Sequence, residues 1–183
     1  MPNPWPFILV LLFGCASQSG WECPDLQRLA RTARSETFRY PDGSLAADGA
    51  HLPGWQQGLA GRVPAWQNVT PVGTWHYFYE SGRRRATITY ALSCYIECCS
   101  GGPCPQVHAY PVGDFTLWYE SGAVRAKGSF VASREHVDTS CEGGDFTLRA
   151  RTSPETKAWD EQGELLNLQL PAVITEEFLP NGS

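Results

Sequence analysis

The chain has 183 residues, of which 42% are hydrophobic and 18% charged, and its net charge is −5 at pH 7. This composition is typical of a globular protein and excludes a disordered chain. The acidic balance argues against a nucleic-acid binder, because no basic surface dominates the chain, so no nucleic-acid partner is expected.

An apolar run near the N-terminus predicts an export signal. Residues 5–13 are too short to span a bilayer, which favours a signal peptide over a transmembrane helix. The run ends in Leu12-Phe13-Gly14-Cys15, which resembles the lipobox of bacterial lipoproteins. That resemblance implies a signal peptide over residues 1–14 and a lipidated, palmitate-bearing Cys15 as the mature N-terminus. It also implies attachment to the cell envelope, at the outer membrane, by acyl chains.

Two other interpretations of this segment stay open. Ordinary signal cleavage after Ala16 would release a secreted or periplasmic protein. A buried structural strand is the third interpretation.

Residues 15–34 are expected to form an N-terminal linker with a short helix. Apolar residues recur at helical spacing between Asp25 and Arg39. The expected apolar face of this helix consists of Leu26, Leu29, Ala30 and Ala33.

A repeated motif runs through residues 35–183, which are predicted to form one β-repeat domain. Pro-Val-Gly-Thr-Trp at 71–75 leads to Tyr-Glu-Ser-Gly at 79–82, and Pro-Val-Gly-Asp-Phe at 111–115 leads to the same tetrapeptide at 119–122. Weaker copies lie on either side. A period of about 40 residues predicts stacked copies of one supersecondary unit. The turn glycines that define this period are Gly43, Gly82, Gly122 and Gly163.

Each copy has the pattern of a β-hairpin. Glu-Ser-Gly suits a short loop in which the glycine takes a positive φ. The strand that follows alternates apolar and polar residues, which predicts an antiparallel sheet with one buried and one solvated face. Small residues such as Gly49 and Gly128 in these strands predict close approach of an aromatic ring from a neighbouring copy.

The order of glycine, aromatic residues, Tyr-x-x-Gly and an alternating strand resembles the MORN repeat, in the variant of bacterial antitoxin-like and envelope proteins. Residues 113–130 and 73–90 match it best. The resemblance implies an all-β chain of tandem hairpins that form an elongated, curved sheet used for association, without catalytic residues. Family repeats are shorter, so each unit here carries an insertion. A small β-propeller is the architectural alternative, since this period also suits four-stranded blades.

Three segments depart from the regular pattern. Pro53–Thr70 is rich in glycine and proline and is interpreted as an ordered loop inserted in the first unit. Arg149–Ala158, which contains Pro154, is expected to interrupt the first strand of the last copy. The tail after Leu165 is expected to form a strand that caps the edge of the sheet.

Six cysteines remain beyond Cys15, and an even number in an exported protein predicts disulfides. Four of them lie in a cysteine-rich insertion, residues 94–104, which the sequence Gly101-Gly102-Pro103 is expected to make irregular. The sequence leaves the connectivity open but favours different partners for the adjacent Cys98 and Cys99. A metal site is the less favoured alternative, because zinc needs reduced thiolates and paired Cys-x2-Cys spacing is missing. No cofactor or metal is therefore expected. The disulfide candidates are Cys23, Cys94, Cys98, Cys99, Cys104 and Cys141.

No nucleophile elbow, phosphate loop or paired-carboxylate motif is present in the sequence, and the four histidines are scattered. The sequence therefore favours a non-catalytic, lipid-anchored envelope protein that binds a protein or glycan. The alternative is an envelope hydrolase or redox protein with its site in the cysteine-rich insertion. The residues predicted to form the binding face are Trp75, Tyr77, Trp118 and Tyr119.

Overall fold

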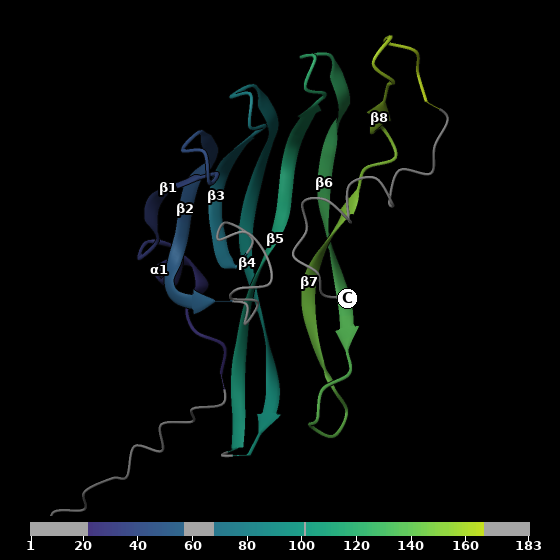
Figure 1. Cartoon of the computed structure of the whole chain (residues 1–183). Coiled ribbons are helices and arrows are strands. Elements are labelled where there is room, and N and C mark those ends of the chain that lie inside the picture. The colour runs from purple at the N-terminus through teal and green to yellow at the C-terminus, as the bar shows by residue number, and fades with distance from the viewer. Residues whose placement is uncertain (1–21, 57–67, 101, 167–183) are drawn as a thin grey trace, which may run out of the picture.

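The computed structural model describes residues 22–56, 68–100 and 102–166 and shows one open antiparallel sheet. Strands β1 to β7 lie in chain order, and β8 pairs with β6 beyond the end of β7 (Figure 1). The all-β prediction is confirmed, and the β-propeller alternative is wrong because these strands form one continuous sheet. The elements are α1 (Leu26–Ala30), β1 (Arg34–Arg39), β2 (Leu45–Gln56), β3 (Val69–Phe78), β4 (Arg84–Cys99), β5 (Gly102–Trp118), β6 (Val124–Val137), β7 (Asp145–Thr152) and β8 (Lys157–Ala158).

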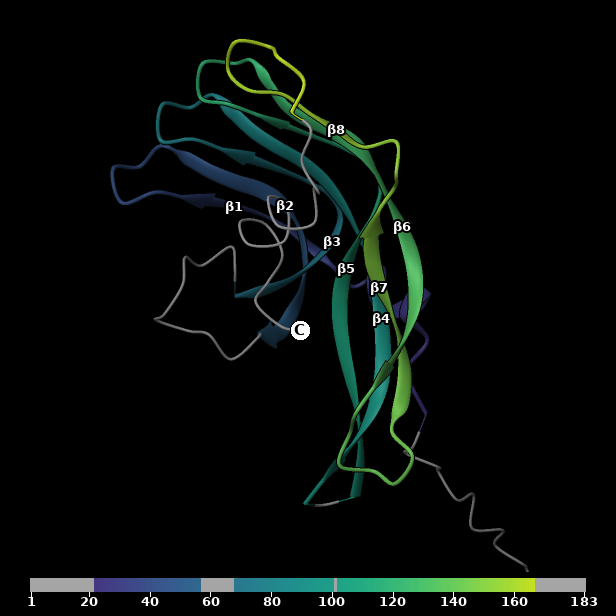
Figure 2. The ribbon, with the colours of Figure 1, turned by 90° about the vertical axis from the view of Figure 1, so that its right-hand side faces the viewer.

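The sheet is curved along its strands, and its long hairpins extend well past the shorter ones (Figure 2). The connecting turns of β1–β2, β3–β4 and β5–β6 lie side by side at the top of Figure 1. At the other end, β4 and β5 continue as one hairpin, and β6 continues into a hairpin with β7. These two extensions, residues 91–110 and 131–152, are called the distal hairpins below.

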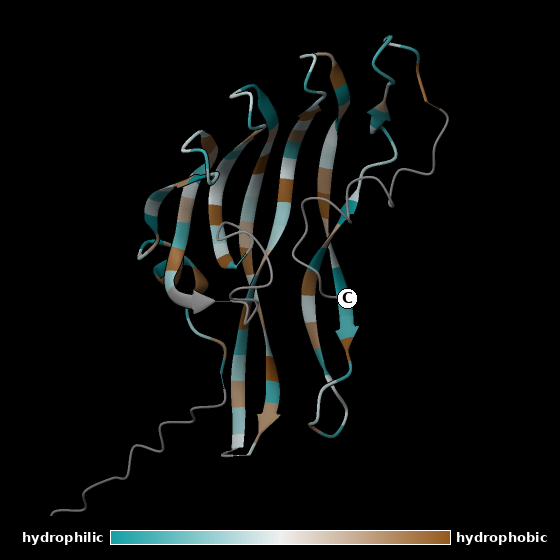
Figure 3. Cartoon of the chain, viewed as in Figure 1, coloured by the Kyte–Doolittle hydropathy of each residue, from teal (hydrophilic) through white to brown (hydrophobic). Residues whose placement is uncertain are grey.

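The core lies on one face of the sheet, where large and small side chains alternate across neighbouring strands. Because side chains in a strand alternate between faces, cross-strand partners share a face. Figure 3 shows the resulting alternation of apolar and polar residues along the strands. The core row consists of the register partners Phe38, Ala47, Tyr77, Ala86, Leu117, Ala126 and Ala158, each at most 8% exposed.

Trp75 is the largest fully buried side chain and belongs to the same face. Its ring stacks on Phe38 and Tyr77 at centroid distances of 5.7 and 5.9 Å, and its Nε1–H donates to the Ala50 carbonyl at 2.8 Å. A Cβ on Gly49 would clash with this ring. The predicted approach of an aromatic ring is confirmed at Gly49, whereas Gly128 packs against Thr156 instead.

The four turns have the same backbone hydrogen bonds, and tyrosines link them. The turn glycines all take the predicted positive φ, from 80 to 94°. Tyr40 Oη donates to the Phe78 carbonyl at 2.8 Å, Tyr79 to Trp118 at 2.8 Å and Tyr119 to Trp159 at 2.9 Å. Each turn is thereby bonded to the next one. In the fourth turn Asp160 replaces tyrosine and accepts from the backbone N–H groups of Gln162 and Glu164, which ends the series.

All six predicted cysteines form disulfides: Cys23–Cys94, Cys98–Cys141 and Cys99–Cys104. Cys98 and Cys99 have different partners, as predicted. The segment around them was expected to be irregular because of its Gly-Gly-Pro sequence, and this expectation is wrong. Strands β4 and β5 stay in register up to the pair Cys99–Gly102, because cross-strand pairing outweighs the local turn signals.

Three predicted boundaries need correction. The helix ends at Ala30, and Arg34–Arg39 pairs with β2 as strand β1. Strand β2 extends through Pro53 to Gln56, and residues 57–67 of the predicted loop lie outside the described residues. The last copy is interrupted only at residues 153–156, since β7 pairs with β6 up to Thr152. Leu165 bridges to Trp159, while the rest of the predicted capping strand lies outside the described residues.

Candidate binding surface

The four aromatic residues predicted as a binding face lie in two different environments. Trp75 and Tyr77 are buried in the core at 0 and 8% exposure, so they are unavailable as surface contacts. Both side chains lie on the face of the sheet that holds the core. The alternation along the strand does not reveal which of its two faces is buried. Trp118 and Tyr119 are half-buried beside the third turn and remain partly accessible.

The opposite face of the sheet carries a polar residue in every strand that contributes to the core row. We call it the polar face. Its hydroxyl and imidazole groups are hydrogen-bonded to each other: Thr74 Oγ1 lies 3.0 Å from Thr89 Oγ1, and His76 Nδ1 lies 3.1 Å from Thr87 Oγ1. All members of its central row are exposed or half-buried. These register partners are Thr37, Asp48, His76, Thr87, Thr116, Lys127 and Lys157.

Arginines and aromatic rings are paired beside the turns. The guanidinium of Arg85 lies 5.7 Å from the ring centroid of Tyr79, and that of Arg125 lies 5.7 Å from Tyr119. Such contacts contribute about 0.5–1 kcal/mol each at exposed positions. Arg83 Nη1 donates to the carbonyls of Glu120 and Ser121, which joins the second turn to the third. The arginine run at 83–85 therefore has structural contacts.

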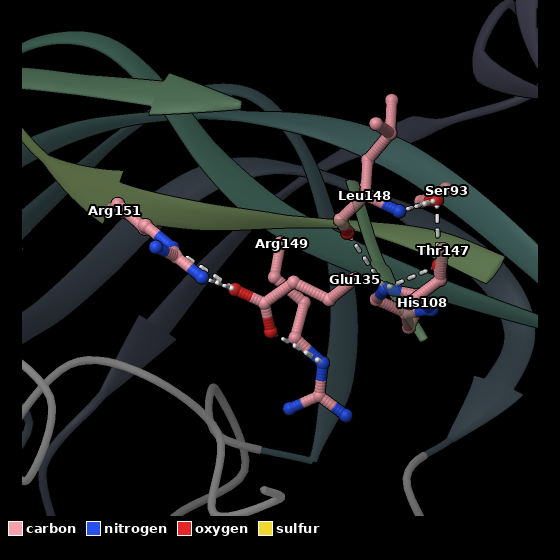
Figure 4. Close-up of polar contacts among 7 residues, drawn as sticks. All are labelled: Ser93, His108, Glu135, Thr147, Leu148, Arg149 and Arg151. Carbon is pink, nitrogen blue, oxygen red and sulfur yellow. Dashed lines mark hydrogen bonds and ion pairs between the residues drawn. The ribbon is translucent and has the colours of Figure 1, made fainter. Parts of the chain in front are cut away.

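A polar network joins the two distal hairpins (Figure 4). Ser93 Oγ lies 2.8 Å from Thr147 Oγ1 and accepts from the Leu148 N–H at 2.9 Å. His108 Nε2 lies 3.2 Å from the Leu148 carbonyl, which can only accept, so we assign the ring proton to Nε2. Nδ1 is then an acceptor that is buried without a partner. Burial lowers the pKa of His108, and the nearby Arg149 lowers it further.

Ion pairs and further hydrogen bonds extend this contact in both directions. Glu135 lies within 3.8 Å of Arg149 and 3.2 Å of Arg151 (Figure 4). Nearer the hairpin ends, the Ile96 N–H donates to Asp145 and the Ser140 N–H to Glu97, each at 2.6 Å. The Cys98–Cys141 disulfide closes the same end. The distal hairpins are thus joined mainly by polar groups and one cross-link.

The contacts of Ser93, His108 and the cysteines bear on the hydrolase and redox alternatives. Ser93 is 4% exposed, and the bonds of its hydroxyl are to Thr147 and Leu148. His108 contacts Thr147 and Leu148, so a hydroxyl lies between histidine and serine. Every cysteine in the described part of the chain is oxidised to a disulfide.

Within residues 22–56, 68–100 and 102–166, no three histidine, cysteine, aspartate or glutamate side chains gather in a group that fits a metal ion. The helix in this part of the chain is too short to cross a bilayer. Cys15 lies outside the described residues.

No protein-family model, curated protein or solved structure matches this chain. The resemblance to MORN repeats therefore rests on the motif residues themselves.

The sequence missed two surface residues that the fold brings together, Lys127 and Lys157. The alternation of β6 places Lys127 on the polar face. Lys157 follows the break at residues 153–156, and its partner is defined only by the pairing of β8 with β6. The one feature of the sequence that sets these two residues apart is that the chain contains no other lysine.

Proposed function

We propose that this protein is a non-catalytic, lipid-anchored protein of the bacterial cell envelope whose sheet binds an envelope protein or glycan. The observation that carries the proposal is the polar face, an open surface that continues in register from β1 to β8 while the opposite face holds the core. A rigid sheet with one open face suits association, which is also what the MORN resemblance implies.

The disulfides support the envelope as the compartment. Three cross-links within a chain of this size persist in oxidising surroundings such as the periplasm and are rare in the cytoplasm. The same consideration argues against a cytoplasmic antitoxin role. The lipobox-like sequence at Cys15 supports attachment by acyl chains.

Fractionation and intact-mass analysis of the full chain made in a Gram-negative host test the proposal. The expected product is a membrane-bound chain that starts at an acylated Cys15 and lacks the six hydrogens lost in forming three disulfides. Cys15→Ala should release the protein from the membrane fraction, whereas the conservative Ser17→Ala should leave it there. A cytoplasmic chain that retains Met1 and free thiols would overturn the proposal.

A further inference from the structure

The chain contains only two lysines, and the fold places them directly opposite each other. Lys127 of β6 and Lys157 of β8 are antiparallel register partners, and both are exposed on the polar face. Neither makes an ion pair within the described part of the chain. Asp114, the acidic residue on the neighbouring strand β5, is the register partner of Ser129 and not of Lys127.

Like charges directly opposite each other destabilise a strand pair. The chain has 19 acidic residues against 14 basic ones, so its composition would favour an acidic partner at either position. Two unpaired ammonium groups at the β8 end of a cross-strand row form a local concentration of positive charge on an acidic protein. An anion bound between them would relieve the repulsion.

The surroundings of this pair indicate which kind of anion fits. Arg125 lies two residues before Lys127 on the same strand face, with Tyr119 beneath its guanidinium. Thr116 is the neighbour of Lys127 on the other side and continues the hydroxyl row to Thr87. Neighbouring strands are about 4.8 Å apart and alternate residues about 7 Å apart, so cations, rings and hydroxyls recur at sugar-sized intervals.

We propose that the polar face around Lys127 and Lys157 binds an anionic polysaccharide, a sugar polymer that carries carboxylate or sulfate groups. The two ammonium groups and Arg125 bind the anions by charge-assisted hydrogen bonds. The half-buried rings of Trp118 and Tyr119 contact the apolar faces of sugars, and the threonines bond to their hydroxyls. This deepens the proposed function, on which it rests for the binding role of the polar face but not for the lipid anchor.

The test measures binding of the oxidised full chain to polygalacturonate and to dextran sulfate by calorimetry, with neutral dextran as the reference polymer. We expect binding to at least one anionic polymer that weakens as salt is raised, and none to neutral dextran. K127Q/K157Q should bind about five- to tenfold more weakly, since two exposed contacts are lost. R28Q/R31Q removes the same charge from exposed positions in and next to α1 and should stay within twofold of the parent.

Three further measurements separate binding from folding, test whether the lysines take part, and distinguish one anion source from another. K127Q/K157Q should unfold at the same or a slightly higher temperature, because the repulsion is gone. Reductive methylation with ¹³C formaldehyde keeps the lysine charges, and both dimethyl-lysine NMR signals should shift on adding the polymer. Vesicles of phosphatidylglycerol and a single-stranded oligonucleotide should bind more weakly than the polysaccharide.

Several outcomes would overturn the proposal. These are no binding to either anionic polymer, equal binding by K127Q/K157Q and the parent, or lysine signals that do not move. Equal or tighter binding of vesicles or of the oligonucleotide would indicate a general polyanion surface instead. None of these outcomes affects the fractionation result, so the envelope proposal stands or fails separately.

Discussion

The half of the sheet next to the turns and the distal hairpins differ in what holds their strands together. We call the first region the turn half; it comprises residues 34–49, 73–90, 111–130 and 157–166. In the turn half, Trp75, Ile88 and Phe115 are at most 1% exposed, and tyrosine hydroxyls bond each turn to the next. In the distal hairpins, Val131, Phe146 and Leu148 are at least 36% exposed, and polar bonds and disulfides make the contacts.

This difference indicates two ways of stabilising an open sheet. Burial of large apolar side chains stabilises the turn half, at about 1.5–3 kcal/mol for each fully buried large residue. The distal hairpins bury fewer such residues, so restricting the unfolded chain by cross-links contributes a larger share of their stability. We therefore expect core substitutions to lower the stability of the whole sheet and loss of a cross-link to open the distal hairpins locally.

The largest effect is expected from removing the central ring of the turn half. Trp75→Ala should lower the free energy of unfolding by about 3–5 kcal/mol, because a fully buried ring leaves a cavity and the Ala50 carbonyl loses its donor. Chemical denaturation with the disulfides intact, followed by far-UV circular dichroism, measures this loss.

Trp118→Ala is the matched control, since it removes the same side chain from a half-buried position. Its cost should be less than half that of Trp75→Ala. Equal costs for the two variants would show that burial in the core row does not distinguish the turn half.

The next effect concerns the cross-link between the distal hairpins. Cys98→Ser/Cys141→Ser removes a disulfide with a sequence separation of 43 and should cost about 2–4 kcal/mol. Hydrogen exchange of the Leu148 amide, which donates to Ser93, should accelerate while that of the Trp75 strand stays slow.

Cys99→Ser/Cys104→Ser provides the comparison for this cross-link. That disulfide closes a separation of only 5 and lies within one hairpin, so its loss should cost less and leave the Leu148 amide protected. Uniform acceleration across both regions in the Cys98→Ser/Cys141→Ser variant would contradict the idea of a separately opening hairpin pair.

The two regions also differ in how much of them the sequence predicts. In the turn half the decisive signals are local: glycines with positive φ follow Tyr-Glu-Ser, and strand residues alternate with period two. These signals do not say which face of the sheet is buried, so the sequence predicts Trp75 and Tyr77 on a binding surface although both lie in the core.

The distal hairpins depend on contacts between residues distant in sequence. Ser93 and Thr147, whose hydroxyls bond, are separated by 54 residues, and neither position has a local pattern that predicts the other. The even number of cysteines predicted disulfides and the adjacency of Cys98 and Cys99 predicted different partners, but the pairing itself needs the fold. The register of Lys127 with Lys157 likewise follows only from the way β8 resumes the ladder after residues 153–156.

A smaller effect is expected from one link of the tyrosine series. Tyr119→Phe keeps the ring beside Arg125 but removes the hydroxyl that donates to the Trp159 carbonyl, so it should cost about 1 kcal/mol. Tyr95→Phe is the control in the distal hairpins, because the Tyr95 hydroxyl makes no hydrogen bond within the described residues. Its effect should stay within about 0.5 kcal/mol. Denaturation midpoints at constant slope measure both, and a Tyr95→Phe variant as unstable as Tyr119→Phe would contradict this assignment.

The smallest effect is the pH dependence of the contact between the distal hairpins. Burial holds the pKa of His108 below its usual range in the folded chain, so the unfolded chain takes up a proton first as the pH falls. The stability contributed by neutral His108 is therefore complete above about pH 6.5, the usual histidine pKa, and is lost as the pH falls through the lower folded value. The groups around the ring are Tyr95 and Ser93 on β4 and Thr147, Leu148 and Arg149 on β7, and the one charge among them is positive.

Burial and the neighbouring positive charge both disfavour protonation of His108, so protonation weakens the contact between the distal hairpins. The Leu148 amide should therefore exchange faster at pH 5.5 than the intrinsic pH dependence of exchange predicts. His108→Gln removes the titration and should abolish this excess. His136→Gln is the control, since His136 is exposed and its ring contacts Phe146. Should the excess persist in His108→Gln, His108 would not be the group that makes the contact between the distal hairpins depend on pH.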